Sequence, residues 1–153
     1  APRPVYERAL ACPALPTCSL AITESARFLT NFLTTVDRLL KKHGMADRAP
    51  VIWMTGCPNG CARPYTAEIG LVGQQAGGRY AVYVGGDAEG TRIASRLMDK
   101  VKTEELSPLL DKLFGFWREE GKYNESFGDF TARIPMEKLT SFVPVATPVK
   151  AVV

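Results

Sequence analysis

The sequence Val51-Ile52-Trp53-Met54-Thr55-Gly56-Cys57-Pro58-Asn59-Gly60-Cys61 runs from four apolar residues into a turn rich in glycine and proline. A short, fully apolar run that ends at such a turn is typical of a buried strand that delivers a loop. We therefore expect a strand over residues 51–54 and a loop over 55–61. That loop should present Cys57 and Cys61 at one end of a sheet.

Outward from this strand, the pattern predicts an α+β fold in which helices cover a small mixed β-sheet. Between residues 19 and 43 the apolar residues recur at steps of three and four, which marks one face of a helix, and Gly44 is a suitable C-cap. The glycines Gly77 and Gly78 separate two strand-like runs and predict a hairpin. Further strands are expected at 68–73, 79–84 and 131–134, a long helix at 103–120 and a short one at 91–98.

The expected organisation has three parts. Residues 1–18 are rich in proline and should form an extended N-terminal segment that carries the first cysteine pair. A single α+β domain should follow over residues 19–139, and residues 140–153 should be a loosely packed tail.

Composition narrows the class of protein. The chain has 153 residues, of which 46% are apolar and 23% charged, as expected for one globular domain. The net charge is +3, without a basic run, so we expect no nucleic-acid partner. No stretch approaches the roughly 18 apolar residues of a membrane-spanning helix, and the first residues lack the apolar core of a secretory signal. We therefore expect no membrane association and a cytoplasmic location.

Four cysteines form two pairs, Cys12 with Cys18 and Cys57 with Cys61. Disulfide frameworks suit small secreted chains with poor cores, which this chain does not resemble. The first pair is too wide for a typical zinc knuckle, and neither pair has the two-residue gap of thioredoxin-like motifs. A [4Fe–4S] cluster needs four thiolates and accepts variable loops between them. The spacing favours an iron–sulfur cluster, while zinc, a disulfide and unliganded cysteines remain alternatives.

Three motifs make the sequence resemble assimilatory sulfite reductases, which belong to the sirohaem and [4Fe–4S] nitrite/sulfite reductase family. They occur in the family's order between about residues 9 and 139. The motifs are ACPALPTC at 11–18 followed by LAITE at 20–24, TGCPNGCARPY at 55–65 followed by AEIGLVG at 67–73, and ESFGDFT at 125–131.

The resemblance implies that all four cysteines bind one [4Fe–4S] cluster and that Cys61 also ligates the iron of a sirohaem. It implies reduction of sulfite to sulfide by six electrons, with electrons from ferredoxin or from a flavoprotein subunit. The residues after Cys61 favour the ferredoxin-dependent type, which would allow a plastid location in a plant or alga. Asn59 and Arg63 are candidate contacts to the cofactors; alternatively, Asn59 is a turn former and Arg63 a solvated surface charge.

One departure from the family concerns length. Its enzymes have several hundred residues, and the arginines and lysines that bind sulfite lie mostly in an N-terminal part that would precede Cys12. We therefore expect this chain to be the C-terminal segment and to be inactive without that part, and we name no catalytic residue within it. An assimilatory nitrite reductase segment is the alternative within the family, although that relative typically has serine at the position of Gly60. A non-catalytic metal-binding or electron-transfer module is the alternative outside it.

Two polar residues outside these motif cysteines have structural interpretations. His43 lies at the expected end of the first helix and should act as a cap residue rather than as a ligand. Asp129, within the third motif, should be structural rather than catalytic.

Overall fold

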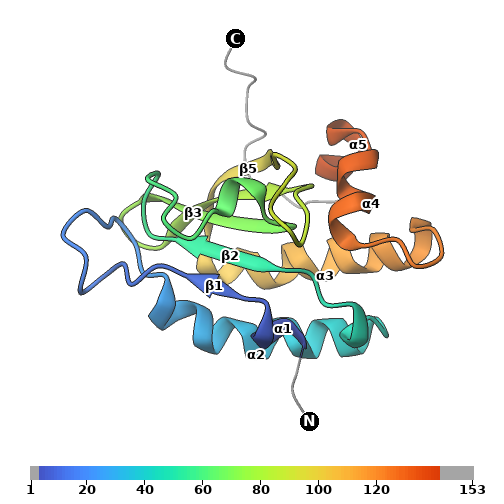
Figure 1. Ribbon diagram of the computed structural model, residues 1–153, viewed down its shortest axis with the longest axis horizontal. Coiled ribbons are helices and arrows are strands. Elements are labelled where there is room, and N and C mark those ends of the chain that lie inside the picture. The colour runs from blue at the N-terminus through green and yellow to red at the C-terminus, as the bar shows by residue number, and fades with distance from the viewer. Residues whose placement is uncertain (1–3, 142–153) are drawn as a thin grey trace.

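A five-stranded sheet in the order β1-β2-β3-β4-β5 organises the chain. The computed structural model describes residues 4–141 (Figure 1). The first three strands are parallel, and β4 and β5 are antiparallel to their neighbours, which confirms the expected mixed sheet. The strands are β1 (Leu10–Ala11), β2 (Ile52–Thr55), β3 (Ile69–Gln75), β4 (Arg79–Val84) and β5 (Ser95–Lys102).

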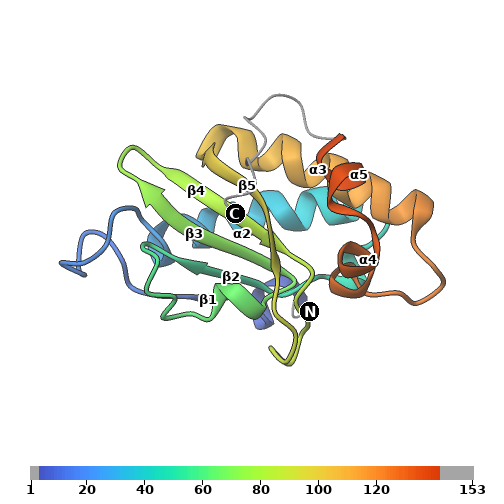
Figure 2. The same ribbon diagram turned by 90° about the horizontal axis from the view of Figure 1, so that it is seen from above.

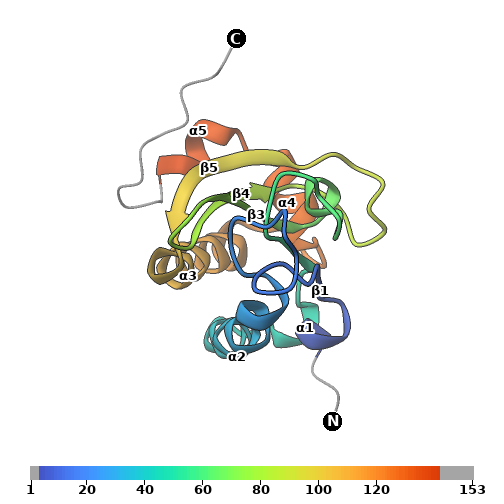
Figure 3. The ribbon, with the colours of Figure 1, turned by 90° about the vertical axis from the view of Figure 1, so that its left-hand side faces the viewer.

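Two long helices, α2 and α3, lie side by side against one face of this sheet (Figures 2 and 3). They correspond to the two long helices expected from the apolar periodicity, although α2 begins seven residues later than the pattern indicates. The helical segments are α1 (Pro4–Glu7), α2 (Ala26–Lys42), α3 (Thr103–Glu120), α4 (Phe127–Arg133), α5 (Met136–Ser141) and the short 3-10 turns η1 (Ala46–Arg48) and η2 (Pro64–Thr66).

The core between the sheet and the helices is aromatic where α3 meets α4. Phe127 is fully buried, and its ring makes edge contacts with Phe114 and Trp117, both at centroid distances of 5.5 Å. Phe130 packs in the same manner against Phe116 at 5.1 Å. These contacts hold α4 at the end of the sheet from which β2 starts (Figure 1).

Two expected elements are wrong because pairing and capping override the local pattern. The short helix at 91–98 is replaced by β5, whose residues pair with β4 over a long sequence separation. The strand at 131–134 is replaced by the end of α4, whose N-cap is Ser126; the serine Oγ accepts a hydrogen bond from the Asp129 N–H.

The two ends of the chain also differ from expectation. Residues 4–11 are not simply extended, because α1 and the short strand β1 form there. At the other end, α5 buries Leu139 completely, as expected within the domain, but the helix continues to Ser141 and so takes in the first two residues of the expected tail. The expected tail beyond Ser141 lies outside the described residues. Within residues 4–141, no helix combines the length and apolar character needed to cross a membrane.

Candidate metal centre

Both cysteine pairs follow the carboxyl ends of adjacent parallel strands. Cys12 comes directly after β1, and Cys57 comes two residues after β2. The Cys12 N–H donates to the Met54 carbonyl at 3.1 Å, which continues the β1–β2 ladder up to the first cysteine. Because β1 and β2 are parallel, this topology delivers both cysteine loops to the same end of the sheet.

The two loops are also bonded to each other. The N–H groups of Ile22 and Thr23 donate to the Gly56 carbonyl at 2.9 and 3.1 Å. A Cβ at Gly56 would lie only 2.5 Å from the Ala14 Cβ, so glycine is required for this approach. Figure 3 views this end of the sheet, where the blue loop after β1 and the green loop after β2 face the reader. The expected position of the cysteine loops is confirmed.

The four thiols are free and differ in exposure. Cys57 is buried, Cys12 and Cys18 are half-buried, and Cys61 is exposed. The Cys12 Sγ accepts a hydrogen bond from the Gly56 N–H at 3.4 Å. Cys12 and Cys61 line one pocket of about 290 Å³, together with Leu10, Ala11, Pro13, Ala62 and Arg63.

This donor set suits an iron–sulfur cluster. Within residues 4–141, no three His, Cys, Asp or Glu side chains converge as a single bound metal ion requires. A [4Fe–4S] cluster places a different demand, because each thiolate binds a different iron atom and the sulfurs stand further apart. Four soft thiols on two adjoining loops are the donor set that such a cluster requires. A second observation supports the fit: the Thr55 hydroxyl, two residues before Cys57, is buried without a hydrogen-bond partner among the described residues.

Asn59 and Arg63 take different positions around the second pair. Asn59 lies exposed at the tip of the 55–61 loop. Arg63 adopts a left-handed backbone, with φ of 56°, and its guanidinium stands 5.9 Å from the centre of the Trp53 ring. Arg63 also lines the pocket with Cys12 and Cys61, which brings a cation to the edge of the site.

Tyr65 is a supporting residue that the spacing argument did not single out. Its hydroxyl donates to the Pro58 carbonyl at 2.7 Å, and its ring packs so closely that a Cβ at Gly60 would lie 2.8 Å from it. Tyr65 therefore braces the turn between Cys57 and Cys61. Its position four residues after the last cysteine, within the second motif, was the available signal.

His43 and Asp129 both have structural partners. His43 Nε2 is hydrogen-bonded to Asp111 Oδ1 at 2.7 Å, which ties the end of α2 to α3, and this bond holds the pKa of Asp111 below its usual range. His43 ends α2 as its C-cap residue, as expected. The Asp129 carboxylate pairs with Arg92 at 2.9 Å.

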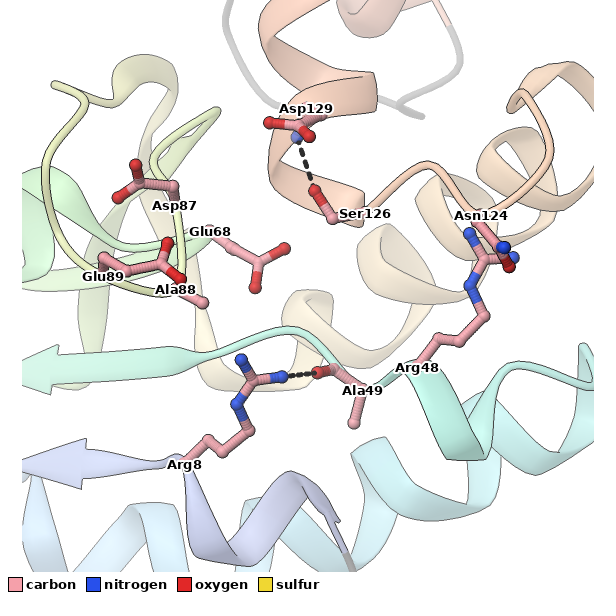
Figure 4. A pocket seen from close by; sticks show the side chains of 10 residues that line it. All are labelled: Arg8, Arg48, Ala49, Glu68, Asp87, Ala88, Glu89, Asn124, Ser126 and Asp129. Atoms are coloured by element: carbon pink, nitrogen blue, oxygen red, sulfur yellow. Dashed lines mark hydrogen bonds between the residues drawn. The ribbon is translucent and has the colours of Figure 1, made fainter.

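A second, charged cavity of about 410 Å³ lies near the opposite ends of β2 and β3 (Figure 4). Its buried charged residue is Glu68, whose carboxylate accepts from the Val51 N–H at 3.2 Å and the Gly128 N–H at 2.8 Å. Burial raises the pKa of Glu68, more than these two hydrogen bonds lower it. Arg48, on the far side, donates to the Glu125 carbonyl and stands over Trp117. The charges of this cavity therefore hold β2, β3 and α4 together.

Comparison with known proteins identifies relatives of this arrangement. Residues 8–150 match the family described as the nitrite and sulphite reductase 4Fe-4S domain. The sulfite reductase [NADPH] hemoprotein beta-component of Shewanella sediminis is 51% identical over 126 residues, covering 82% of this chain and 22% of that protein. The protein of the same name from Escherichia coli is 46% identical over 130 residues, covering 85% of this chain and 23% of that protein. The chain thus spans less than a quarter of the length of these curated relatives.

The fold is also found in a solved structure. The structure of the Mycobacterium tuberculosis NirA protein matches with a TM-score of 0.77 and 24% sequence identity, covering 91% of this chain and 27% of that chain. At this identity the match shows the shared fold alone. It confirms that the mixed sheet with its helices is an established architecture.

Proposed function

The chain belongs to the nitrite and sulphite reductase 4Fe-4S domain family, and from this premise we propose that it is the C-terminal, cluster- and sirohaem-binding segment of a sulfite reductase. The observation that carries the proposal is the meeting of the two cysteine loops at the ends of β1 and β2. The enzyme would reduce sulfite to sulfide, which takes six electrons. The names of the relatives support sulfite as the substrate.

In this proposal Cys12, Cys18, Cys57 and Cys61 hold the cluster. Cys61 is the exposed member and lines the pocket, so its thiolate would also be available to bind the sirohaem iron. When bound, the cluster and sirohaem supply one-electron transfer to the iron at which substrate is reduced. Arg63 lines this pocket, where its cation would pair with a carboxylate of the sirohaem. The exposed Asn59 would present its amide to the cofactors from the tip of the loop.

The remaining parts of the reaction are assigned to other components. We propose that the groups that bind sulfite lie outside residues 1–153, in the part of the enzyme that the longer relatives possess. The relatives' names include NADPH, so we propose an NADPH-linked flavoprotein subunit as the electron donor in place of ferredoxin. Thiolates that bind a cluster must stay reduced, so the proposal includes a cytoplasmic location.

Anaerobic purification of the natural polypeptide that carries these residues tests the proposal. Iron and acid-labile sulfide assays should each give about four atoms per chain for the cluster, with one further iron and tetrapyrrole absorption for sirohaem. Cys57→Ser should abolish the cluster, while the matched surface variant Tyr123→Ala should retain it, because Tyr123 is 95% exposed. A cluster without tetrapyrrole would indicate an electron-transfer module. A colourless protein that takes up no iron would refute the proposal, and preference for nitrite over sulfite would correct the substrate.

A further inference from the structure

Thr55 carries an unsatisfied hydroxyl at the base of the candidate metal centre. The residue is completely buried at the end of β2. Within residues 4–141, its Oγ1 is the one buried side-chain nitrogen or oxygen that has no hydrogen-bond partner. Leaving a buried hydroxyl unpaired is unfavourable, so such an atom indicates a missing partner.

Two neighbouring hydroxyl groups, in contrast, have hydrogen-bond partners. Thr23 Oγ1 donates to the Gly56 carbonyl at 3.3 Å, and Ser25 Oγ donates to the Met54 carbonyl at 2.7 Å. Both carbonyls belong to residues that flank Thr55. The Thr55 hydroxyl takes part in neither bond.

The sheet register places Thr55 beside a candidate cluster ligand. In the β1–β2 pair, Leu10 is opposite Trp53 and Ala11 is opposite Met54. Because the Cys12 N–H continues the ladder to the Met54 carbonyl, the next pair in register is Cys12 with Thr55. Paired residues of neighbouring strands point to the same face of a sheet. Thr55 and Cys12 therefore share a face, on the side where Cys12 and Cys61 line their pocket.

We infer that the Thr55 hydroxyl donates a hydrogen bond to a sulfur of the bound cluster. The inference rests on the proposed function, and it assigns the missing partner to a sulfide or a thiolate of the group held by the four cysteines. A donor at sulfur stabilises the additional negative charge of the reduced cluster, so Thr55 raises the cluster's reduction potential. Thr55 is thus a positioning and tuning residue rather than a ligand.

The variant Thr55→Val separates this role from a structural one. It removes the hydroxyl and retains the branched shape of the side chain. In the cofactor-free protein the hydroxyl has no partner to lose, so the variant should unfold at the wild-type temperature or above it. In the cluster-loaded protein, loss of the donor should move the midpoint potential to more negative values. Thr55→Ser retains the donor and should restore a potential close to that of wild type.

Thr131→Val is the matched control. The Thr131 hydroxyl is also buried, but it donates to the Phe127 and Gly128 carbonyls at 2.8 and 3.2 Å, in α4 at the far end of the sheet. Its loss should lower the unfolding temperature and leave the potential unchanged. Thr55→Val should therefore change the midpoint potential without lowering the unfolding temperature, whereas Thr131→Val should lower the unfolding temperature without changing the potential.

The experiment is a redox titration, followed by electron paramagnetic resonance, of the natural polypeptide with its cluster bound. A negative shift in Thr55→Val alone, reversed in Thr55→Ser, supports the inference. An unchanged potential in Thr55→Val with full iron and sulfide content overturns it, and so does an equal shift in Thr131→Val. A wild-type protein that binds no iron overturns the proposed function and this inference with it. The iron assay on wild type therefore distinguishes the two failures.

Discussion

Gly56 is a position at which the two cysteine loops of the candidate metal centre come into direct contact. A Cβ there would lie 2.5 Å from the Ala14 Cβ and 2.5 Å from the Thr23 carbonyl oxygen, while ordinary contacts begin at 3.4 Å. Neither neighbour is the flexible end of a long side chain. Gly56→Ala therefore requires the 12–18 and 55–61 loops to separate by about the shortfall in those distances, which would part the two cysteine pairs.

The expected energetic effect follows from these contacts. Inserting a methyl group into packed structure costs about 1–3 kcal/mol. The backbone of Gly56 is outside the left-handed region, so alanine gains about 0.4–1 kcal/mol by restricting the unfolded chain. The free energy of unfolding should fall by roughly 1–2 kcal/mol, the balance of the two effects. For a chain of this size, each kcal/mol corresponds to about 2–4 °C in the unfolding temperature.

Gly44→Ala is the control, because it should cause a similar loss of stability at a different position. At Gly44 nothing lies within 4 Å of an added Cβ, but φ is +71°, so alanine incurs the left-handed backbone penalty of about 1–2 kcal/mol. This turn follows the C-terminal end of α2, whereas the 12–18 loop precedes the N-terminal end of that helix.

The assay combines thermal unfolding with iron and acid-labile sulfide content in the anaerobically purified natural polypeptide. Both variants should unfold at lower temperature than wild type, but Gly56→Ala alone should lose cluster content. If Gly56→Ala keeps wild-type iron and sulfide content, then the close approach of the two loops is not what assembles the site, and the reasoning is refuted.

Three further predictions concern packing, titration and the second cysteine loop. Phe127→Ala should lower the free energy of unfolding by about 3–5 kcal/mol, because it empties the aromatic contact between α3 and α4; denaturant unfolding checks this, and a loss below 1 kcal/mol would contradict it. Burial raises the pKa of Glu68, so the folded state favours the protonated carboxyl group. The stability that this protonated group contributes is fully present below the ordinary carboxyl pKa and is lost as pH rises through the raised pKa. The stability of wild type relative to Glu68→Gln, measured by denaturant unfolding across that pH range, should therefore decline with rising pH, and a flat difference would refute the assignment. Tyr65→Phe should cost about 1 kcal/mol through the lost bond to Pro58 and accelerate cluster loss in air, whereas Tyr123→Phe, at an exposed position, should change neither quantity.

Much of the candidate site was predictable because its determinants are local in sequence. The apolar run before Cys57 specifies a buried strand, and the glycines and prolines after it specify a loop, so the end of β2 and its thiols follow from neighbouring residues. The same holds for α2 and α3, whose apolar residues recur with the helical period over many turns. The four cysteines and their grouping as two pairs were likewise evident from the sequence alone.

Tertiary structure decided the features that depend on partners distant in the chain. β5 is a strand because β4 supplies its hydrogen bonds, although its own residues permitted a helix. The buried Glu68 links two segments far apart in sequence, because the N–H groups of Val51 and Gly128 both donate hydrogen bonds to its carboxylate. The sequence alone does not indicate that Cys12 lies beside Thr55. Only the parallel pairing of β1 with β2 sets them side by side, because register is a property of two strands together and cannot be deduced from either one.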